Sequence, residues 1–263
     1  MTLWGPFRLR LARACAPALA AALAVAPSAA QDISVSVSDN VIVLSDRKRS
    51  GGIEMLSMTP DALEFSVAAA GAPEGARDGS EHLRWSPPRT LVPPNRGVPL
   101  RVSFRPPEGL EPGEYVARLN VQSRPANPPP VVQPAEAPEG GAGLSVRVPI
   151  VPVLPVTIYI RHKIDPPALE VERFEPARGD ADMLGHFLVR KPAGVSFVGT
   201  VAVVAETDGS VLSRGRLRLG QTITESRVAV PRGDGQRGVA GAVCLRVWRD
   251  FPEQGEPDTV RCN

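Results

Sequence analysis

Few residues in this sequence have the types and spacing that catalysis or metal binding requires. The three histidines, His82, His162 and His186, are scattered, and no two of them have the spacing of a metal site or of an H-E-x-x-H helix. The sequence has no G-x-S-x-G elbow and no phosphate-binding loop. We therefore expect a protein that is not an enzyme and that uses no metal or other cofactor.

The cysteines indicate a disulfide. Of Cys15, Cys244 and Cys262, the first lies in an N-terminal leader, which leaves an even number for an exported chain. A hairpin whose loop is flanked by Trp248 and Asp258, a register chosen to fit the cysteines, is compatible with this bridge because it places Cys244 opposite Cys262. Such a bridge would contribute about 3 kcal/mol by restricting the unfolded chain. Two free thiols are the alternative.

The leader has the pattern of a secretory signal peptide, residues 1–30. Arg8, Arg10 and Arg13 precede an Ala/Leu/Val-rich stretch, and Ser28 and Ala30 supply small residues before a cleavage point. An N-terminal membrane anchor is the alternative interpretation. The leader holds three of the 30 basic residues and none of the 28 acidic ones, so the remaining chain is nearly neutral. Net charge therefore gives no support for nucleic-acid binding.

Short alternating segments separated by Gly, Pro, Asn and Asp predict an all-β protein. Leu100, Val102 and Phe104 share one face of such a segment, as do Tyr115 and the alternate residues after it. We expect strands at 33–37, 41–44, 52–58, 63–68, 82–86, 98–105 and 115–122 and within 144–163. This number and spacing of strands indicates a Greek-key β-sandwich.

A second series of alternating segments predicts a second sandwich. The expected strands are 169–174, 183–189, 196–206, 211–219, 226–230, 239–248 and 259–262. The predicted organisation is a first domain at 31–160, a linker at 161–168 and a second domain at 169–263. Within the first domain, residues 123–143 are rich in Pro and Gly and are expected to form a loop.

The most apolar stretch after the leader is "LSVRVPIVPVLPVTIYIRHK", residues 144–163. Its uncharged part, 148–160, is shorter than the roughly 20 residues that a membrane-spanning helix needs. Pro149, Pro152 and Pro155 also exclude a regular helix. We therefore expect extended chain, with a bulge or break near Pro152.

Two segments resemble the periplasmic pilus-assembly chaperones. They are "NVIVLSDRKRSGGIEMLS" at 40–57 and "LRWSPPRTLVPPNRGVPLRVSFRPPEGLEPGEYVARLNVQ" at 83–122, and the resemblance extends over most of 33–160 and more weakly over the second domain. It implies two immunoglobulin-like domains with a cleft between them. It also implies periplasmic localisation and partners that are pilin or fimbrial subunits and an outer-membrane usher.

The resemblance implies donor-strand complementation, in which the last strand of the first domain completes the sheet of a subunit. Leu144, Val146, Val148 and Ile150 have one parity and would form the subunit-binding face. The alternative is that this face packs into the chaperone's own sandwich. A dimer in which two copies cap each other is also open.

In this family a basic pair in the cleft binds the carboxylate at the subunit's C-terminus. The family's arginine would fall near Asn40 or Val41, and neither of these is basic. Arg161 and Lys163 are the nearest substitutes, and Arg47 with the two basic residues after it is the second choice. Solvated charge in a turn is the alternative for both clusters.

The resemblance thus implies a periplasmic chaperone, or a chaperone-like protein, that caps subunits during pilus assembly, fimbrium biogenesis and cell wall organization. The alternative is a secreted two-domain β-sandwich module, adhesive or structural, that donates no strand. A carbohydrate-binding β protein is a third hypothesis.

Overall fold

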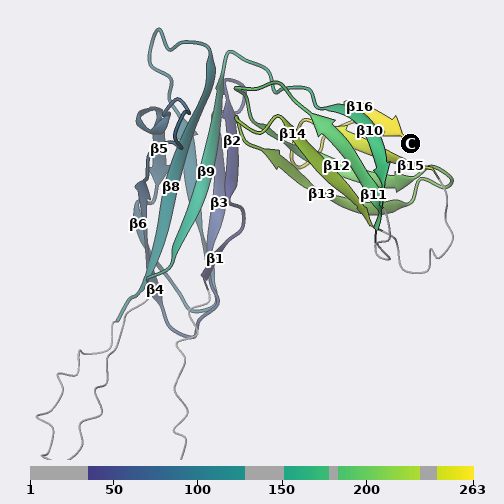
Figure 1. Ribbon diagram of the computed structural model, residues 1–263. Coiled ribbons are helices and arrows are strands. Elements are labelled where there is room, and N and C mark those ends of the chain that lie inside the picture. The colour runs from purple at the N-terminus through teal and green to yellow at the C-terminus, as the bar shows by residue number, and fades with distance from the viewer. Residues whose placement is uncertain (1–34, 128–150, 178–182, 232–241) are drawn as a thin grey trace, which may run out of the picture. The chain divides into compact units, whose positions relative to one another are not determined.

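The computed structural model describes residues 35–127, 151–177, 183–231 and 242–263. These residues form sixteen strands and one short 3-10 helix, η1 (Ser80–His82), so the predicted all-β class is confirmed. The strands belong to four sheets that pair into two sandwiches (Figure 1). Within these ranges no helix has the length and apolar character needed to cross a bilayer. The predicted signal peptide, 1–30, lies outside the described residues.

The first sandwich consists of a four-stranded sheet, ordered β1-β3-β7-β5, and a five-stranded sheet, ordered β2-β9-β8-β4-β6. Its strands are β1 (Val35–Val37), β2 (Val41–Ser45), β3 (Ser50–Ser57), β4 (Leu63–Ala69), β5 (Leu83–Ser86), β6 (Arg89–Val92), β7 (Gly97–Phe104), β8 (Gly113–Pro125) and β9 (Val153–His162). All pairs are antiparallel except β2–β9, which is parallel. Neighbours that are not consecutive in sequence agree with the predicted Greek-key arrangement.

The alternating residues predicted to face inward form the core of this sandwich. Leu100, Val102 and Phe104 of β7 are buried there, together with Tyr115 and Leu119 of β8. The Tyr115 hydroxyl donates a hydrogen bond of 2.9 Å to the backbone carbonyl of Glu111. This is the tyrosine corner of immunoglobulin-like sandwiches, in which a tyrosine near the start of a strand bonds to the backbone just upstream.

The strands of the first sandwich differ from the prediction in several places. Strand β6 was not predicted, because it is short and follows Pro87 and Pro88. Strand β8 continues to Pro125, inside the segment expected to be a loop, because its pairing with β4 extends to Leu63. Strand β9 ends at His162, two residues past the predicted end of the domain. The rest of the predicted loop, from residue 128, lies outside the described residues.

The second sandwich consists of a three-stranded sheet, β10-β11-β14, and a four-stranded sheet, β13-β12-β15-β16. Its strands are β10 (Glu170–Pro176), β11 (Met183–Arg190), β12 (Phe197–Ala205), β13 (Val211–Leu219), β14 (Glu225–Pro231), β15 (Val243–Trp248) and β16 (Thr259–Cys262). Cys244 pairs directly with Cys262 in the antiparallel β15–β16 hairpin, and the two form a disulfide. The predicted bridge and its hairpin register are confirmed.

Candidate functional site: the open edge of β9 and the cavity beside it

Strands β1 and β2 are neighbours in the sequence but belong to different sheets of the first sandwich. β1 pairs with β3 in one sheet, and β2 pairs with β9 in the other. Residues 38–40, which we call the crossover, lie between them. The Ser38 amide donates to the Glu54 carbonyl at 2.8 Å, and the Thr157 amide of β9 donates to the Asn40 carbonyl at 2.9 Å. The crossover is therefore bonded to one sheet at its start and to the other at its end.

This division leaves part of β9 unpaired along one edge. β9 pairs with β8 from Val153 to His162, but it pairs with β2 only from Thr157 to Arg161 (Figure 1). Among the described residues, no strand lies beside Val153–Val156 on that second side; we call this segment the open edge. An unpaired edge of this kind is a template on which another extended chain can pair.

The sequence of the open edge fits its position. The Thr157 amide points toward β2, so Pro155, two residues earlier, has its ring nitrogen on the same, unpaired side. A proline there removes no hydrogen bond from the ladder with β8, which is where prolines are tolerated in sheets. Val151 and Val153 are 40% and 44% exposed, which leaves apolar surface beside the edge.

The apolar stretch of the sequence divides at the start of β9. Its C-terminal part is a strand of the protein's own core, with Val156, Ile158 and Ile160 fully buried. β9 begins at Val153, immediately after Pro152, where a bulge or break was expected. The predicted subunit-binding residues, Leu144, Val146, Val148 and Ile150, lie outside the described residues.

Arg161 forms its contacts with other residues of the protein. Its side chain is 5% exposed, its Nε lies 3.4 Å from a Glu114 carboxylate oxygen, and one terminal nitrogen donates to the Ser196 carbonyl at 2.9 Å. Burial lowers the pKa of the Arg161 guanidinium from its ordinary value, and the Glu114 carboxylate opposes that shift. Arg161 is therefore engaged within the protein, and its predicted role as an anchor has no support from its surroundings.

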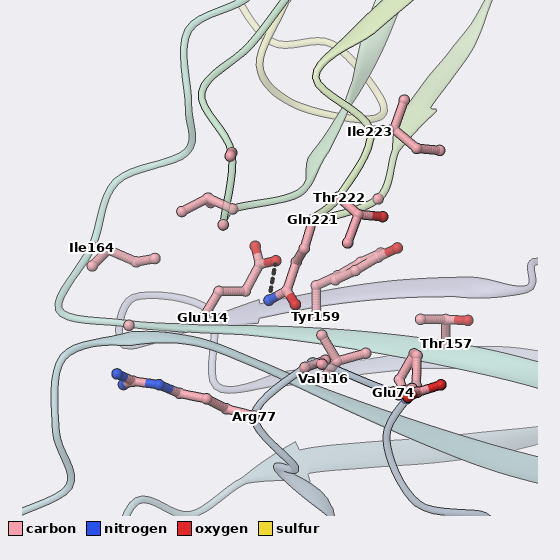
Figure 2. Close-up of a pocket in the computed structure, with 18 of the residues that line it drawn as sticks. Glu74, Arg77, Glu114, Val116, Thr157, Tyr159, Ile164, Gln221, Thr222 and Ile223 are labelled. Atoms are coloured by element: carbon pink, nitrogen blue, oxygen red, sulfur yellow. Dashed lines mark hydrogen bonds between the residues drawn. The ribbon is translucent and has the colours of Figure 1, made fainter.

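Glu114 is the centre of this buried network. Its side chain is fully buried and accepts hydrogen bonds from the Ser196 amide and hydroxyl, each at 2.8 Å, and from the Gln221 side-chain amide at 3.1 Å (Figure 2). Ser196 and Gln221 belong to the second sandwich and Glu114 to the first. The network therefore joins the loops before β12 and after β13 to strands β8 and β9.

The two other predicted anchor residues lie at the end of β9. Lys163 is exposed, and its backbone amide donates to Asp46 at 2.6 Å. The second oxygen of Asp46 lies 2.8 Å from Nδ1 of the buried His162. Arg47 is exposed in the turn after β2. The structure thus brings Lys163 close to the Arg47 turn, and their binding role stays a prediction.

A cavity of about 850 Å³ lies beside this network. Figure 2 shows Val116, Thr157 and Tyr159 along one wall, with Thr222 and Ile223 across from them. The lining comes from residues 73–77, from β8 and β9, and from the loops at 193–195 and 220–223, together with the side chain of Arg218. Both sandwiches thus contribute to the cavity wall.

Arg218 is the functional candidate that the sequence did not single out. Its Nε donates to the Tyr159 hydroxyl at 3.2 Å and a terminal nitrogen to the Thr157 hydroxyl at 3.0 Å, and its guanidinium lies 5.5 Å from the centre of the Tyr159 ring. Within the described residues no carboxylate pairs with it. A guanidinium held by neutral groups at a cavity can bind a carboxylate with both of its parallel N–H groups.

Candidate metal ligands do not form a site. In the part of the chain that the structure describes, one group of side chains has suitable spacing, namely Glu206, Cys244 and Cys262. Its two sulfur atoms are joined to each other in the disulfide, so no thiolate is available.

No protein-family model matches the sequence, and no curated protein matches it. Among solved structures, the chain is similar to one of Salmonella enterica SafA pilin in complex with the SafB chaperone, with 13% identity over 89% of this chain and 98% of that one and a TM-score of 0.44. It is also similar to the Escherichia coli chaperone DraB, with 11% identity over 82% of this chain and 91% of that one and a TM-score of 0.43. With the Pseudomonas aeruginosa CupB2 chaperone it shares 12% identity over 87% of this chain and 97% of that one, with a TM-score of 0.41. These similarities are distant.

Proposed function

We propose that the protein is a periplasmic chaperone that binds and caps pilin-type subunits by donating an edge strand. The open edge at Val153–Val156, with the apolar segment 144–150 immediately before it in sequence, is the observation that carries this proposal. The sequence segments that resemble pilus-assembly chaperones support it. An outer-membrane usher is the further partner that this function requires, and a second copy of the chain is an alternative occupant of the edge.

The mechanism is β-augmentation. Leu144, Val146, Val148 and Ile150 have the same parity as Leu154 and Val156, which contact the core of the first sandwich. As an extended strand, the segment 144–150 would present these four side chains on one face. A subunit that lacks one strand supplies the missing contacts: its backbone pairs with the edge, and its groove takes the alternate apolar side chains.

Arg218 is the residue we propose for the carboxylate at the subunit's C-terminus. It lines the cavity, its bonds go to two neutral hydroxyls, and Tyr159 orients the guanidinium. Arg161, by contrast, is committed to Glu114 and Ser196. A carboxylate at Arg218 gains a charge-assisted contact without breaking an existing ion pair.

Co-expression with candidate subunits in the periplasm, followed by co-purification, tests the donated strand. Val146→Glu and Val148→Glu place a charge in the apolar groove of the subunit, so each is expected to abolish capture while the chaperone stays folded. Ser145→Glu is the matched control, because its side chain has the opposite parity, and it is expected to retain capture. Unchanged capture by both valine variants would refute strand donation and favour the two-domain adhesion or structural module.

The same capture assay tests the anchor. Arg218→Ala is expected to weaken capture about tenfold or more, the loss typical of a charge-assisted pair. A subunit peptide with a free C-terminal carboxylate should bind more tightly than the same peptide amidated, and Arg218→Ala should remove that difference. Lys163→Ala, measured in the same way, tests the anchor residue that was predicted from the sequence. Equal preference for the free carboxylate in the wild type and Arg218→Ala would exclude Arg218 from the site.

A further inference from the structure

Arg214, Arg216 and Arg218 lie at alternate positions of β13 and share one face, but they contact different residues. Arg214 forms an ion pair with Glu253, inside the second sandwich. Arg216 forms an ion pair with Asp39 and donates to the Asn40 side chain at 3.1 Å, both in the crossover of the first sandwich. Arg216 thus contacts the segment in which the chain passes from one sheet to the other.

The crossover is otherwise held by few hydrogen bonds. Asp39 accepts one from the Val41 amide at 2.8 Å, which starts β2. Ser38 exchanges two with Glu54, through its own amide and through its hydroxyl, each at 2.8 Å. The Asn40 carbonyl accepts one from Thr157, which is the first contact between this segment and β9. Any shift of the crossover therefore changes where β2 begins to cover β9.

The position of the crossover sets the length of the open edge. The parallel register aligns Val41 with Thr157, so extending β2 by two residues places Asp39 opposite Pro155. The open edge would then be partly covered by the protein's own chain. Asp39 cannot join β2 in this way while its carboxylate is bound to Arg216 and caps the Val41 amide.

Arg216 is itself held in place. Its guanidinium lies 5.1 Å from the centre of the Phe251 ring, a cation–π distance. The loop that carries Phe251 is fixed by a hydrogen bond of 3.0 Å from the Trp248 indole to the Gly255 carbonyl and by an Arg249–Asp258 contact at 2.8 Å. Such a planar, stacked guanidinium suits two acceptors at once, which a lysine ammonium does not.

We propose that Arg216 is a positioning residue that fixes the crossover and thereby sets where β2 begins to cover β9. The use of the open edge for subunits depends on the proposed function, but the state of the crossover can be measured without a subunit. Arg216 does not contact the open edge, and it acts through Asp39 and Asn40. Arg214, on the same face and strand, has its ion pair inside the second sandwich and serves as the matched control.

Amide hydrogen exchange of the exported chain, read by NMR, tests the proposal. In Arg216→Ala, exchange at Val41 and Thr157 is expected to be about tenfold faster relative to the core amide of Leu119, because the crossover opens locally. Arg216→Lys keeps the positive charge but lacks the parallel N–H groups of the guanidinium, so it should give an intermediate increase in the exchange rate. If the alanine variant does not fold, the lysine variant decides the test. Arg214→Ala should leave both amides at the wild-type rate.

Exchange at Val41 and Thr157 that is unchanged in both Arg216 variants overturns the proposal, as does an equal increase in Arg214→Ala. Capture of subunits separates this result from the proposed function. If the wild type captures no subunit, the proposed function fails, and the exchange data still decide whether Arg216 fixes the crossover. If Arg216→Ala exchanges rapidly at both amides but captures subunits as the wild type does, the link between the crossover and the edge is wrong.

Discussion

Glu114 and Arg161 show how the surroundings of a residue determine its role. Arg161 directly follows the apolar run and is, with Lys163, the nearest substitute for the basic pair that the resemblance to pilus-assembly chaperones implies; solvated charge in a turn is the alternative. The structure buries Arg161 against a carboxylate 47 residues away in sequence and against the backbone of Ser196. Two charges removed from water in this way are tolerated because each has several hydrogen-bond partners. The Glu114–Arg161 pair is thus a contact within the protein, and Arg218 is the residue that we propose as the anchor.

Glu114→Gln is expected to destabilise the protein by about 3–5 kcal/mol, because it leaves the buried Arg161 guanidinium without a counter-charge. Urea unfolding of the variant and the wild type measures the change through the midpoint at constant m-value. Glu111→Gln is the control: its side chain is 80% exposed and its contact with Arg77 is 3.7 Å, so the expected change is within about 0.5 kcal/mol. Equal midpoints for the two variants would contradict a structural role for the pair.

At the scale of elements, the segment before η1 packs closely against β8 and β9. Gly79 lies over both strands: a Cβ there would be 2.7 Å from Ile160 Cδ1 and 2.9 Å from Tyr115 Cβ. The Gly79 amide also donates to the Val116 carbonyl at 3.0 Å, so the segment continues the hydrogen bonding of β8 where β4 has ended. The backbone must therefore approach the strands more closely than a side chain allows.

Gly79→Ala is expected to cost about 1–3 kcal/mol, the range for forcing an extra methyl group into a packed core. Thermal unfolding should show this as a lower Tm. Gly215→Ala is the matched control, since a Cβ at Gly215 meets no atom within 4 Å, and its effect should be within about 0.5 kcal/mol. If Gly79→Ala had the same Tm as the control, the segment that contains Gly79 would be able to move away from β8 and β9 without loss of stability.

At the scale of the whole molecule, two groups of buried contacts join residues of the two sandwiches, besides the contacts of Arg216 and Arg218. One is the Glu114 network with Ser196 and Gln221. The other is a small apolar cluster in which Val198 of β12 packs with residues of the first sandwich, chiefly Val116 and Tyr159. Because both involve buried groups, we expect the two sandwiches to unfold in one cooperative transition.

Removing the disulfide tests this coupling. Replacing Cys244 and Cys262 by Ser is expected to lower the stability of the second sandwich by about 3 kcal/mol. With coupled unfolding, hydrogen exchange at Ala117 of the first sandwich and at Val203 of the second should accelerate by the same factor. Adding Glu114→Ala should confine the effect of the disulfide to Val203. Acceleration at Val203 alone in the variant that keeps Glu114 would show that the sandwiches unfold independently.

Features that depend on residues close together in the chain could be predicted from the sequence alone. Alternation of apolar and polar side chains located nearly every strand and the core faces of β7 and β8, because side chains of a strand alternate between its two faces. The even cysteine count of an exported chain favoured the Cys244–Cys262 bridge, and the antiparallel pairing of β15 with β16 agrees with it.

The open edge of β9, the burial of Arg161 and the place of Arg218 at the cavity could be known only from the assembled fold. The open edge depends on where the first strand changes sheets, and that position is fixed by contacts of Asp39 and Asn40 with Arg216, more than 170 residues later. The exposure of Arg161 and Arg218 depends on Glu114 and Tyr159, which are in different strands from the arginine that each contacts. Local alternation carries no information about such partners, because burial and pairing are properties of the assembled sheets.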